Sequence, residues 1–474
     1  MQSLAAKTPR LVVPGLKNLG NTCFFNAILQ ALASLPSMHE YLEEIELQAR
    51  VTRHKVAFTG ALCDCLRALM PRNEHEACGV VVPRILNAEL TSNLAAFRGH
   101  KQQDSQELLQ SLFKLVRKEH RRCSVQDRGL CSLLGDDSED ALASSSISDL
   151  RLLQAVDERN WNPFQGLQVN LLQCSRCQRF CPLDNQPFLD VSLSLVTHGD
   201  KKVLRLTDAL HLYTEPEIIK EVVCSYCSVA DELEVARKEY ALSMREQTDS
   251  YLEITQLEQK GWIRELEQLS SSSSFSLEEL GRPIPRSRGE ICKRLQFSRS
   301  PDVFCFHLNR KVYRSTGGAV KLETFVEFPL ELDMSVYCQY EFDSVVEQAK
   351  TLVTGVARPT NGLIRRSGSS LAFCEKQKLQ YLIYDLMAVI LHHGNERCGH
   401  FTAYRRASPS QWFFVSDENV REASEVEVLS SCAYMLFYER KFRAKRRTRS
   451  SETEETTDDD DSLPDVEPHL LRPS

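Results

Sequence analysis

The sequence predicts an α+β fold, because two kinds of hydrophobic periodicity divide the chain. Residues 15–125 are mainly helical in pattern, and within 104–118 the residues Leu108, Leu112 and Leu115 recur at helical spacing. From Trp161 onward, short alternating segments that are typical of strands take over. The clearest of these strand segments are 167–174, 188–195, 302–310, 386–393, 399–406, 411–417 and 433–440.

Two helix starts can be predicted in the first part. A short helix over Asn26 to Leu35 follows a loop that contains glycine. Asp104 with Glu107 three residues later has the spacing of an N-terminal helix cap.

Composition restricts the class of protein. The chain has 474 residues, of which 42% are apolar and 26% charged, so a sizeable core is expected and a fully disordered or collagen-like chain is excluded. The net charge of −7 argues against a generic nucleic-acid binder.

The 17 cysteines are an odd number, and the chain shows no secretory signal and no long apolar run. We therefore expect an intracellular, reduced protein whose cysteines serve as a nucleophile, metal ligands or core residues.

Composition also suggests where the domain ends. We expect a tail over 1–10, one domain over 11–440 and a second tail over 441–474, with polar insertions at about 231–288 and 339–379 and a mobile loop at 131–150. Six basic residues within 441–449 precede seven acidic ones within 452–461. Such a tail is typically solvated, and the alternatives are an import or anionic-surface patch, or phosphorylation near Ser450, Ser451 and Thr453.

Cys23 is the strongest candidate nucleophile. It ends a loop that contains Asn18, Gly20 and Asn21, and it stands at the start of a predicted helix. Backbone N–H groups at a helix start favour a thiolate over a thiol and can stabilise an oxyanion, with Asn18 as a further donor. The alternative is a buried structural cysteine.

A nucleophilic cysteine needs a base, and His400 is the candidate. It lies in the strand-like segment Gly399-His-Phe-Thr-Ala-Tyr404, and the order of a cysteine followed much later by a histidine matches the papain-like arrangement. His392 and His393 are competitors.

Two CxxC pairs predict a zinc site. Cys174 with Cys177 and Cys224 with Cys227 each offer two thiolates from one turn, and 46 residues separate the pairs. Four filled positions leave none for water, so the predicted Zn2+ is structural. Cys181 is a competing ligand with a less suitable spacing, and four unligated thiols are the alternative.

Several segments together resemble the ubiquitin-specific protease family. Residues 15–32 resemble its cysteine box, while CGHFTAY and QWFFVSDENV resemble its histidine box. Further matches follow in the family's order over about 11–440, apart from the two insertions: QQDSQELL, FQGLQVNLLQCSRC, FLDVSLSL, SPDVFCFHLNR and AYMLFYER. The resemblance implies a papain-like cysteine protease with a helical thumb, a β-rich palm and zinc-bearing fingers.

The family's roles can be carried over to matching positions. Cys23 aligns with the nucleophile, His400 with the general base and Asn18 with the oxyanion-hole asparagine. Ser416 departs from the pattern, because the family usually has Asp or Asn there, followed by Asp. A serine can accept a hydrogen bond from imidazole but carries no charge, and Asp417 is a candidate to compensate. The alternative for Ser416 is a strand-end serine without a role.

The resemblance also implies the substrate. It predicts a deubiquitinase that cleaves after the C-terminal glycine of ubiquitin through an acyl-enzyme on Cys23, with ubiquitin and ubiquitinated proteins as partners. Gln103 and Asp104 match positions near the cleft for the ubiquitin tail, although capping of a helix by Asp104 is an equal explanation. The competing functions are a weak or inactive ubiquitin-binding scaffold and a zinc-containing nucleic-acid adaptor.

The same segments resemble a mitochondrial outer-membrane branch of the family. That branch implies a role against mitochondrial ubiquitination and mitophagy, and it leads us to expect an N-terminal anchor followed by a basic stretch, which this sequence does not show. We therefore expect a cytosolic form without a membrane span, or a mitochondrial outer-membrane protein if an anchor precedes Met1.

Overall fold

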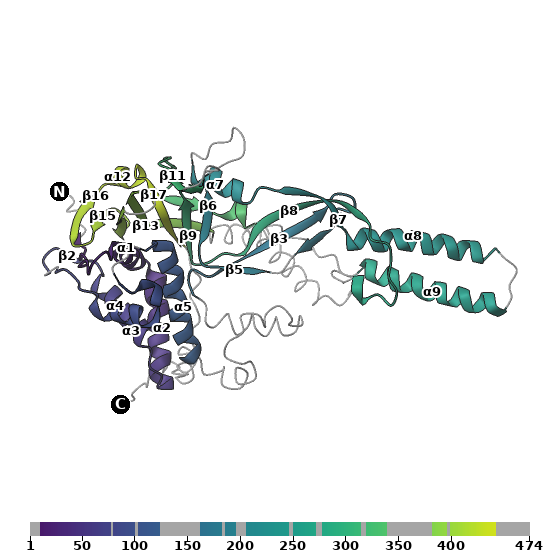
Figure 1. The fold of residues 1–474 in the computed structure, drawn as a ribbon, viewed down its shortest axis with the longest axis horizontal. Helices are drawn as coiled ribbons and strands as arrows, with labels where there is room; N and C mark the ends of the chain where they lie inside the picture. The colour runs from purple at the N-terminus through teal and green to yellow at the C-terminus, as the bar shows by residue number, and fades with distance from the viewer. Residues whose placement is uncertain are drawn as a thin grey trace, which may run out of the picture.

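In a computed structural model of the chain, a helical subdomain packs against a large mixed sheet, and a second sheet leads to a long helical hairpin (Figure 1). The structure describes residues 10–76, 79–99, 103–123, 162–182, 185–195, 205–245, 250–271, 277–313, 319–338, 382–395 and 399–441. The loop predicted at 131–150, the insertion at 339–379 and nearly all of both predicted tails lie outside these residues. Helices and sheets are both extensive, which agrees with the predicted α+β class.

The helical subdomain consists of α1 to α5. Its bounds are α1 Cys23–Leu32, α2 Pro36–Thr52, α3 Ala57–Ala68, α4 Arg84–Asn93 and α5 Ser105–Cys123. Helix α1 is buried along its whole length, and apolar faces of α2, α3 and α5 surround it. The predicted helix at 26–35 therefore begins and ends three residues earlier, because the loop before Cys23 already turns the chain into the helix.

The large sheet carries the second half of the chain. Its order is β16 (Asn419–Ala423), β15 (Gln411–Ser416), β14 (Gly399–Ser408), β13 (Ile383–Gly394), β17 (Ala433–Arg440), β9 (Val303–Asn309) and β6 (Val191–Ser194), with β12 (Glu331–Asp333) beside β13. All neighbours are antiparallel except β6 and β9. One face packs on the helical subdomain and the other forms a second core, which explains why β17 and β9 are apolar on both faces.

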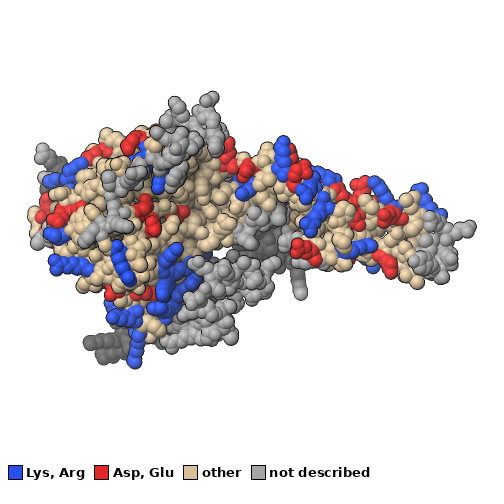
Figure 2. Space-filling model, viewed as in Figure 1, with Lys and Arg blue, Asp and Glu red and all other residues tan. Residues whose placement is uncertain are grey.

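The second sheet extends away from this body. Its order is β4 (Phe180–Pro182), β3 (Gly166–Cys174), β8 (Arg288–Arg299) and β7 (Glu217–Val223), with β5 (Gln186–Phe188) beside β3. Helices α8 (Ser225–Ser243) and α9 (Ser250–Ser271) continue from β7 and pack on each other through Val229, Trp262 and Leu266. Acidic and basic side chains are interspersed over the visible face of this hairpin (Figure 2). The predicted polar insertion at 231–288 is thus mostly a helical hairpin.

Shorter elements complete the described fold. They are β1 (Leu11–Val12), β2 (Arg72–Asn73), α7 (Leu206–Tyr213), β10 (Lys311–Tyr313), β11 (Ala319–Lys321), α12 (Glu425–Leu429) and three 3-10 turns at Ala95–Phe97, Leu277–Glu279 and Ser335–Tyr337. Among the described residues, none of the helices combines the length and apolar character needed to cross a membrane.

A buried arginine joins helix α1 to the large sheet. The side chain of Arg405 on β14 is fully buried and donates to Gln30 Oε1 at 2.8 Å, Leu69 O at 2.9 Å and Ala33 O at 3.1 Å. Burial lowers the pKa of Arg405 to about 9. The three acceptors lie on or next to α1 and α3, so the position of the C-terminal end of α1 is set by the strand that also carries His400.

Candidate active site and metal centre

The shape of the loop before Cys23 depends on two residues with a left-handed backbone conformation and on the side chain of Asn18. Gly20 and Asn21 have φ values of 106° and 54°, and Asn18 Oδ1 accepts N–H bonds from Gly20 at 2.9 Å and Thr22 at 3.2 Å. Since Asn21 is a residue type that tolerates this conformation, the turn forms without a second glycine there. The loop places Cys23 as the first residue of α1.

His400 and Ser416 meet across the large sheet. His400 lies at the start of β14 and Ser416 is the last residue of β15, and pairing of these antiparallel strands brings them together. His400 Nε2 and Ser416 Oγ are 2.9 Å apart. Because Nε2 faces the serine, Nδ1 is the ring nitrogen that remains for proton exchange with a nucleophile. Next to His400, the backbone N–H of Phe401 contacts the thiol of Cys23.

The thiol of Cys23 is buried, with 4% of the residue exposed. Burial raises its pKa above the usual value, and the negative charge of Asp417 adds to this effect. The N–H groups of Phe401, Phe24 and Cys23 itself oppose the shift without reversing it. The expectation that the helix start favours a thiolate is therefore wrong for this state of the protein, because desolvation outweighs the N–H groups.

Asp417 connects the serine turn to the cysteine loop. It has a φ of 52°, and its two carboxylate oxygens accept bonds from Asn18 Nδ2 at 2.8 Å and Asn26 Nδ2 at 2.7 Å. Its backbone oxygen accepts from the N–H of Leu16 at 2.8 Å. Among the described residues, the hydrogen bonds of this carboxylate go to the two amides and not to His400, so in this structure it positions the loop instead of substituting for a charged triad member.

Gly15 allows this approach of the loop and the turn. A Cβ atom at position 15 would lie 2.6 Å from the backbone oxygen of Glu418, which is closer than any side chain tolerates. A glycine is therefore needed where the two segments touch.

Asn18 is held in a defined orientation. Its Oδ1 accepts from the loop amides, and its Nδ2, which carries two hydrogens, donates to Asp417. The structure therefore brings Asn18 and Cys23 into one loop, and Asp417 links that loop to the turn after Ser416.

Asp104 and Gln103 lie at the start of α5, beside the large sheet. Asp104 Oδ1 accepts the N–H of Gln106 at 2.7 Å, which is the predicted helix cap, and Asp104 Oδ2 accepts from Tyr434 OH at 2.5 Å. Gln103 Nε2 donates to Ala96 O at 3.0 Å. One oxygen of Asp104 thus caps the helix, and the other joins α5 to β17.

A second carboxylate belongs to the same row of polar contacts between α5 and the large sheet, which we call the polar seam. Asp190, just before β6, accepts from Gln106 Nε2 at 2.6 Å and Gln110 Nε2 at 2.8 Å. On the neighbouring strands, His307 Nδ1 lies 3.0 Å from Ser192 Oγ, and its ring packs edge-on against Tyr434. Burial lowers the pKa of His307 and raises that of Tyr434, so both are neutral groups in the seam.

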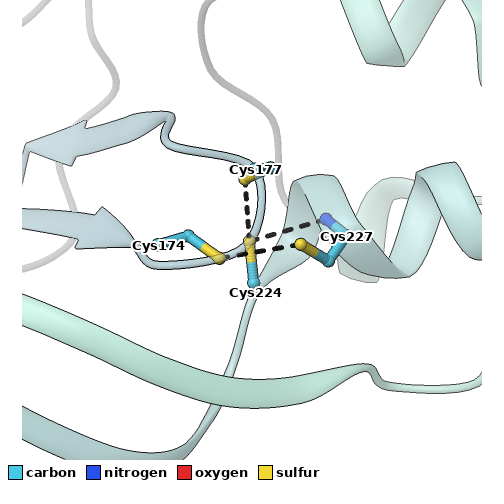
Figure 3. Close-up of side chains that lie close together, drawn as sticks. All are labelled: Cys174, Cys177, Cys224 and Cys227. Atoms are coloured by element: carbon cyan, nitrogen blue, oxygen red, sulfur yellow. Dashed lines mark hydrogen bonds between the residues drawn. The ribbon is translucent and has the colours of Figure 1, made fainter.

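Four cysteines form a compact cluster at the far end of the second sheet (Figure 3). Cys174 is the last residue of β3 and Cys177 lies in the turn that follows, while Cys224 caps the start of α8 and Cys227 lies in its first turn. All four sulfurs lie within 4.8 Å of one another, with Cys174 to Cys227 at 3.6 Å and Cys177 to Cys224 at 3.7 Å. Metal–sulfur bonds of about 2.3 Å in a tetrahedron place sulfurs about 3.8 Å apart, so the cluster fits one metal ion. The side chain of Cys181 is outside the described residues.

Sequence reasoning missed the roles of Asn26 and Asn18 as partners of one carboxylate, and it missed the seam of Asp190, His307 and Tyr434. Asn26 lies one turn into α1 from Cys23, and an amide within this mainly apolar helix is a signal of a buried polar contact.

Comparison with known families gives one match over most of the chain. The family model described as ubiquitin carboxyl-terminal hydrolase matches residues 14–438. The chain is also similar to curated proteins named ubiquitin carboxyl-terminal hydrolase 30. The Danio rerio protein is 27% identical over 90% of this chain and 86% of its own length. The Homo sapiens protein is 26% identical over 94% of this chain and 87% of its own length.

A solved structure shares the fold. It is the SAGA Ubp8/Sgf11/Sus1/Sgf73 DUB module bound to ubiquitin aldehyde, which matches with a TM-score of 0.55 at 19% identity over 93% of this chain and 73% of that chain. This likeness, together with the family match, confirms the predicted ubiquitin-specific protease fold. The helical subdomain is its thumb, the large sheet its palm and the second sheet its fingers.

Asp417 can be tested apart from the residues that do chemistry. We expect Asp417→Ala to lower kcat by roughly tenfold to a hundredfold with little change in KM, because Asn18 and the cysteine loop lose their anchor. The measurement is steady-state cleavage of ubiquitin C-terminal amide substrates. The matched control is Glu418→Ala, an exposed neighbour whose ion pair with Lys17 is 3.6 Å long, and it should stay within about twofold. Equal rates for the two variants would contradict the positioning role.

The cysteine cluster can be tested by metal content. We expect about one metal ion per chain, and we expect Cys174→Ser with Cys177→Ser to lose it and to lower the thermal midpoint by roughly 5 °C or more. Elemental analysis and a thermal melt measure both effects. Cys292→Ser, on β8 outside the cluster, is the control and should keep the metal. A wild-type protein with far less than one ion would contradict the assignment.

Proposed function

The chain belongs to the ubiquitin carboxyl-terminal hydrolase family, and we propose that Cys23, His400 and Ser416 give it thiol-dependent deubiquitinase activity. The observation that carries this proposal is the 2.9 Å contact of His400 with Ser416 on strands that also bring Phe401 against the Cys23 thiol. A nucleophile, a base and a group that orients the base then come from three segments that only the fold brings together.

The reaction proceeds by acyl transfer. His400 Nδ1 takes the proton of the Cys23 thiol, and the sulfur attacks the carbonyl carbon of the C-terminal glycine of ubiquitin. Asn18 Nδ2 and backbone N–H groups at the start of α1 stabilise the oxyanion. The imidazolium gives its proton to the leaving amine as the C–N bond breaks. Water then attacks the thioester while His400 accepts its proton, the C–S bond breaks, and the proton returns from His400 to the Cys23 sulfur.

The raised pKa of Cys23 makes His400 necessary as the base that removes the thiol proton. Because burial raises the pKa of the Cys23 thiol, the sulfur depends on His400 to remove its proton before or during attack. Ser416 fixes the ring through Nε2 but supplies no negative charge for the imidazolium. These two features favour a slow enzyme, and they are the reason to keep a weakly active ubiquitin-binding scaffold as the second candidate.

Three further assignments complete the proposal. We infer that Gln103 and Asp104 line the path of the ubiquitin tail, since they lie where α5 meets β17. We infer that the ion of the cysteine cluster is structural Zn2+, because four thiolates suit zinc and leave no position for water.

A role against mitochondrial ubiquitination and mitophagy is supported only by the resemblance to ubiquitin carboxyl-terminal hydrolase 30. Absence of the tagged chain from purified mitochondria would contradict this role.

The activity is tested by reaction of the purified protein with ubiquitin that carries a C-terminal electrophile, followed by intact mass. We expect one added ubiquitin in the wild type and none in Cys23→Ala, because the thiol is the reacting atom. Cys305→Ala, which removes a thiol buried in the palm, is the control and should still be labelled. A wild-type chain that binds ubiquitin but forms no adduct would establish the scaffold instead.

The same probe tests Ser416. We expect Ser416→Ala to slow labelling by roughly tenfold or more, because His400 loses the partner of Nε2, and we expect Ser416→Asp to retain labelling. A rate in Ser416→Ala equal to that of the wild type would remove Ser416 from the site.

A further inference from the structure

The end of the helical subdomain that lies farthest from the large sheet carries a group of basic side chains. We call it the distal basic patch, and it consists of Arg50, Arg53, Lys55, Lys118, Arg121 and Arg122. All six residues are exposed. The first three lie at the end of α2 and in the loop that follows, and the others lie in the last turns of α5.

Two contacts show why the patch lies far from the active site. The N-terminal end of α2 is fixed to β17 by a bond of 2.8 Å from the N–H of Ser37 to Glu439 Oε1. The N-terminal end of α5 is fixed to the same strand by the 2.5 Å bond between Asp104 and Tyr434. Both helices therefore run away from the sheet, and their lengths place the patch about 25 Å from it (Figure 1).

The two halves of the patch lie together. Glu119 on α5 accepts the N–H groups of Phe58 at 3.1 Å and Thr59 at 2.8 Å, which are in the first turn of α3. The thiol of Cys123 contacts the hydroxyl of Thr52 at the end of α2. These contacts hold the loop with Lys55 against the last turns of α5, so the cations form one surface.

The patch keeps its positive charge. Within the part of the chain that the structure describes, none of its six side chains forms an ion pair. Two carboxylates beside the patch have other partners, since Glu119 accepts from the amides of α3 and Glu46 pairs with Arg67 at 2.5 Å. Figure 2 shows Lys and Arg concentrated along the lower half of α5 and at the lower end of α2, although the whole chain has a net charge of −7.

A cavity of about 440 Å³ opens within the patch. Arg50, Arg53, His54 and Lys55 line it, together with Glu46. His54 Nδ1 is buried and has no hydrogen-bond partner among the described residues. The cavity thus offers three cations and a buried ring nitrogen that can donate to an anion when the proton lies on it, which is the chemistry that receives a phosphate group.

Two exposed aliphatic side chains adjoin these cations. Leu47 is 61% exposed and Val51 is 72% exposed, and both share the face of α2 that carries Arg50. An acidic protein would need only the cations, whereas cations beside exposed aliphatic groups are typical of surfaces that lie on anionic lipid.

We propose that the distal basic patch docks on a bilayer surface that contains anionic phospholipids. The cavity receives a lipid phosphate, and Leu47 and Val51 enter the boundary between headgroups and acyl chains. Cys23, beside the large sheet, then stays away from the lipid and open to ubiquitin. The proposal does not depend on the deubiquitinase assignment, because it uses no residue of the active site.

The test is flotation of the purified full chain with vesicles of phosphatidylcholine, with or without phosphatidylserine. We expect binding only to the vesicles that contain phosphatidylserine, and we expect it to weaken as salt is added. Arg121→Gln with Arg122→Gln should weaken binding by about thirtyfold, since each cation near such a surface contributes about a factor of five. Leu47→Ser with Val51→Ser should weaken it as well.

The matched control is Lys260→Gln with Arg264→Gln, two exposed cations one turn apart on α9, which should bind as the wild type does. Thermal melting shows that each variant is folded. Three results would overturn the proposal: equal flotation with both kinds of vesicle, wild-type binding by Arg121→Gln with Arg122→Gln, or retention on immobilised polyglutamate without vesicle binding. The last result would assign the patch to an acidic protein.

Discussion

The carboxylate of Asp417 joins two segments that are separated by 399 residues in the sequence, and the geometry of the active site depends on this link. Its two oxygens accept one amide from each side of Cys23, so the loop before Cys23 and the first turn of α1 are fixed to the same group. A carboxylate suits this place because it only accepts hydrogen bonds, and its two partners here, Asn18 Nδ2 and Asn26 Nδ2, are both donors. The position of Ser416, one residue earlier, is fixed by the same turn.

Arg405 has the corresponding role at the other end of α1. Among the described residues its hydrogen bonds go to the side-chain oxygen of Gln30 on α1 and to the backbone oxygens of Ala33 and Leu69, which follow α1 and α3. The two backbone oxygens lie at the negative C-terminal ends of these helices, which compensates part of the cost of burying the charge. An anion at the start and a cation at the end thus attach α1 to the sheet that carries His400, so the proposed catalytic groups are held in place without a bound substrate.

Much of this architecture could be predicted from the sequence, because each strand of the palm has a local apolar pattern. The segments 399–406, 411–417 and 433–440 agree with β14, β15 and β17 to within two residues at each end. The CxxC pairs were equally local signals, and the structure brings all four thiols together. Contacts between distant polar groups could not be predicted, because nothing in the local pattern shows that Asp417 faces Asn26 or that Asp104 faces Tyr434. The direction of the pKa shift of Cys23 was wrong for the same reason, since burial depends on the packed fold and not on the loop.

The burial of Cys23 also has a consequence for redox chemistry. Hydrogen peroxide and small alkylating agents react with thiolates and hardly at all with thiols. Cys23 is 4% exposed and burial raises its pKa, and both features lower its reactivity toward such reagents in the resting protein. In the proposed mechanism its reactivity appears when His400 and a bound substrate act on it together, so selectivity among electrophiles comes from the resting state of the protein.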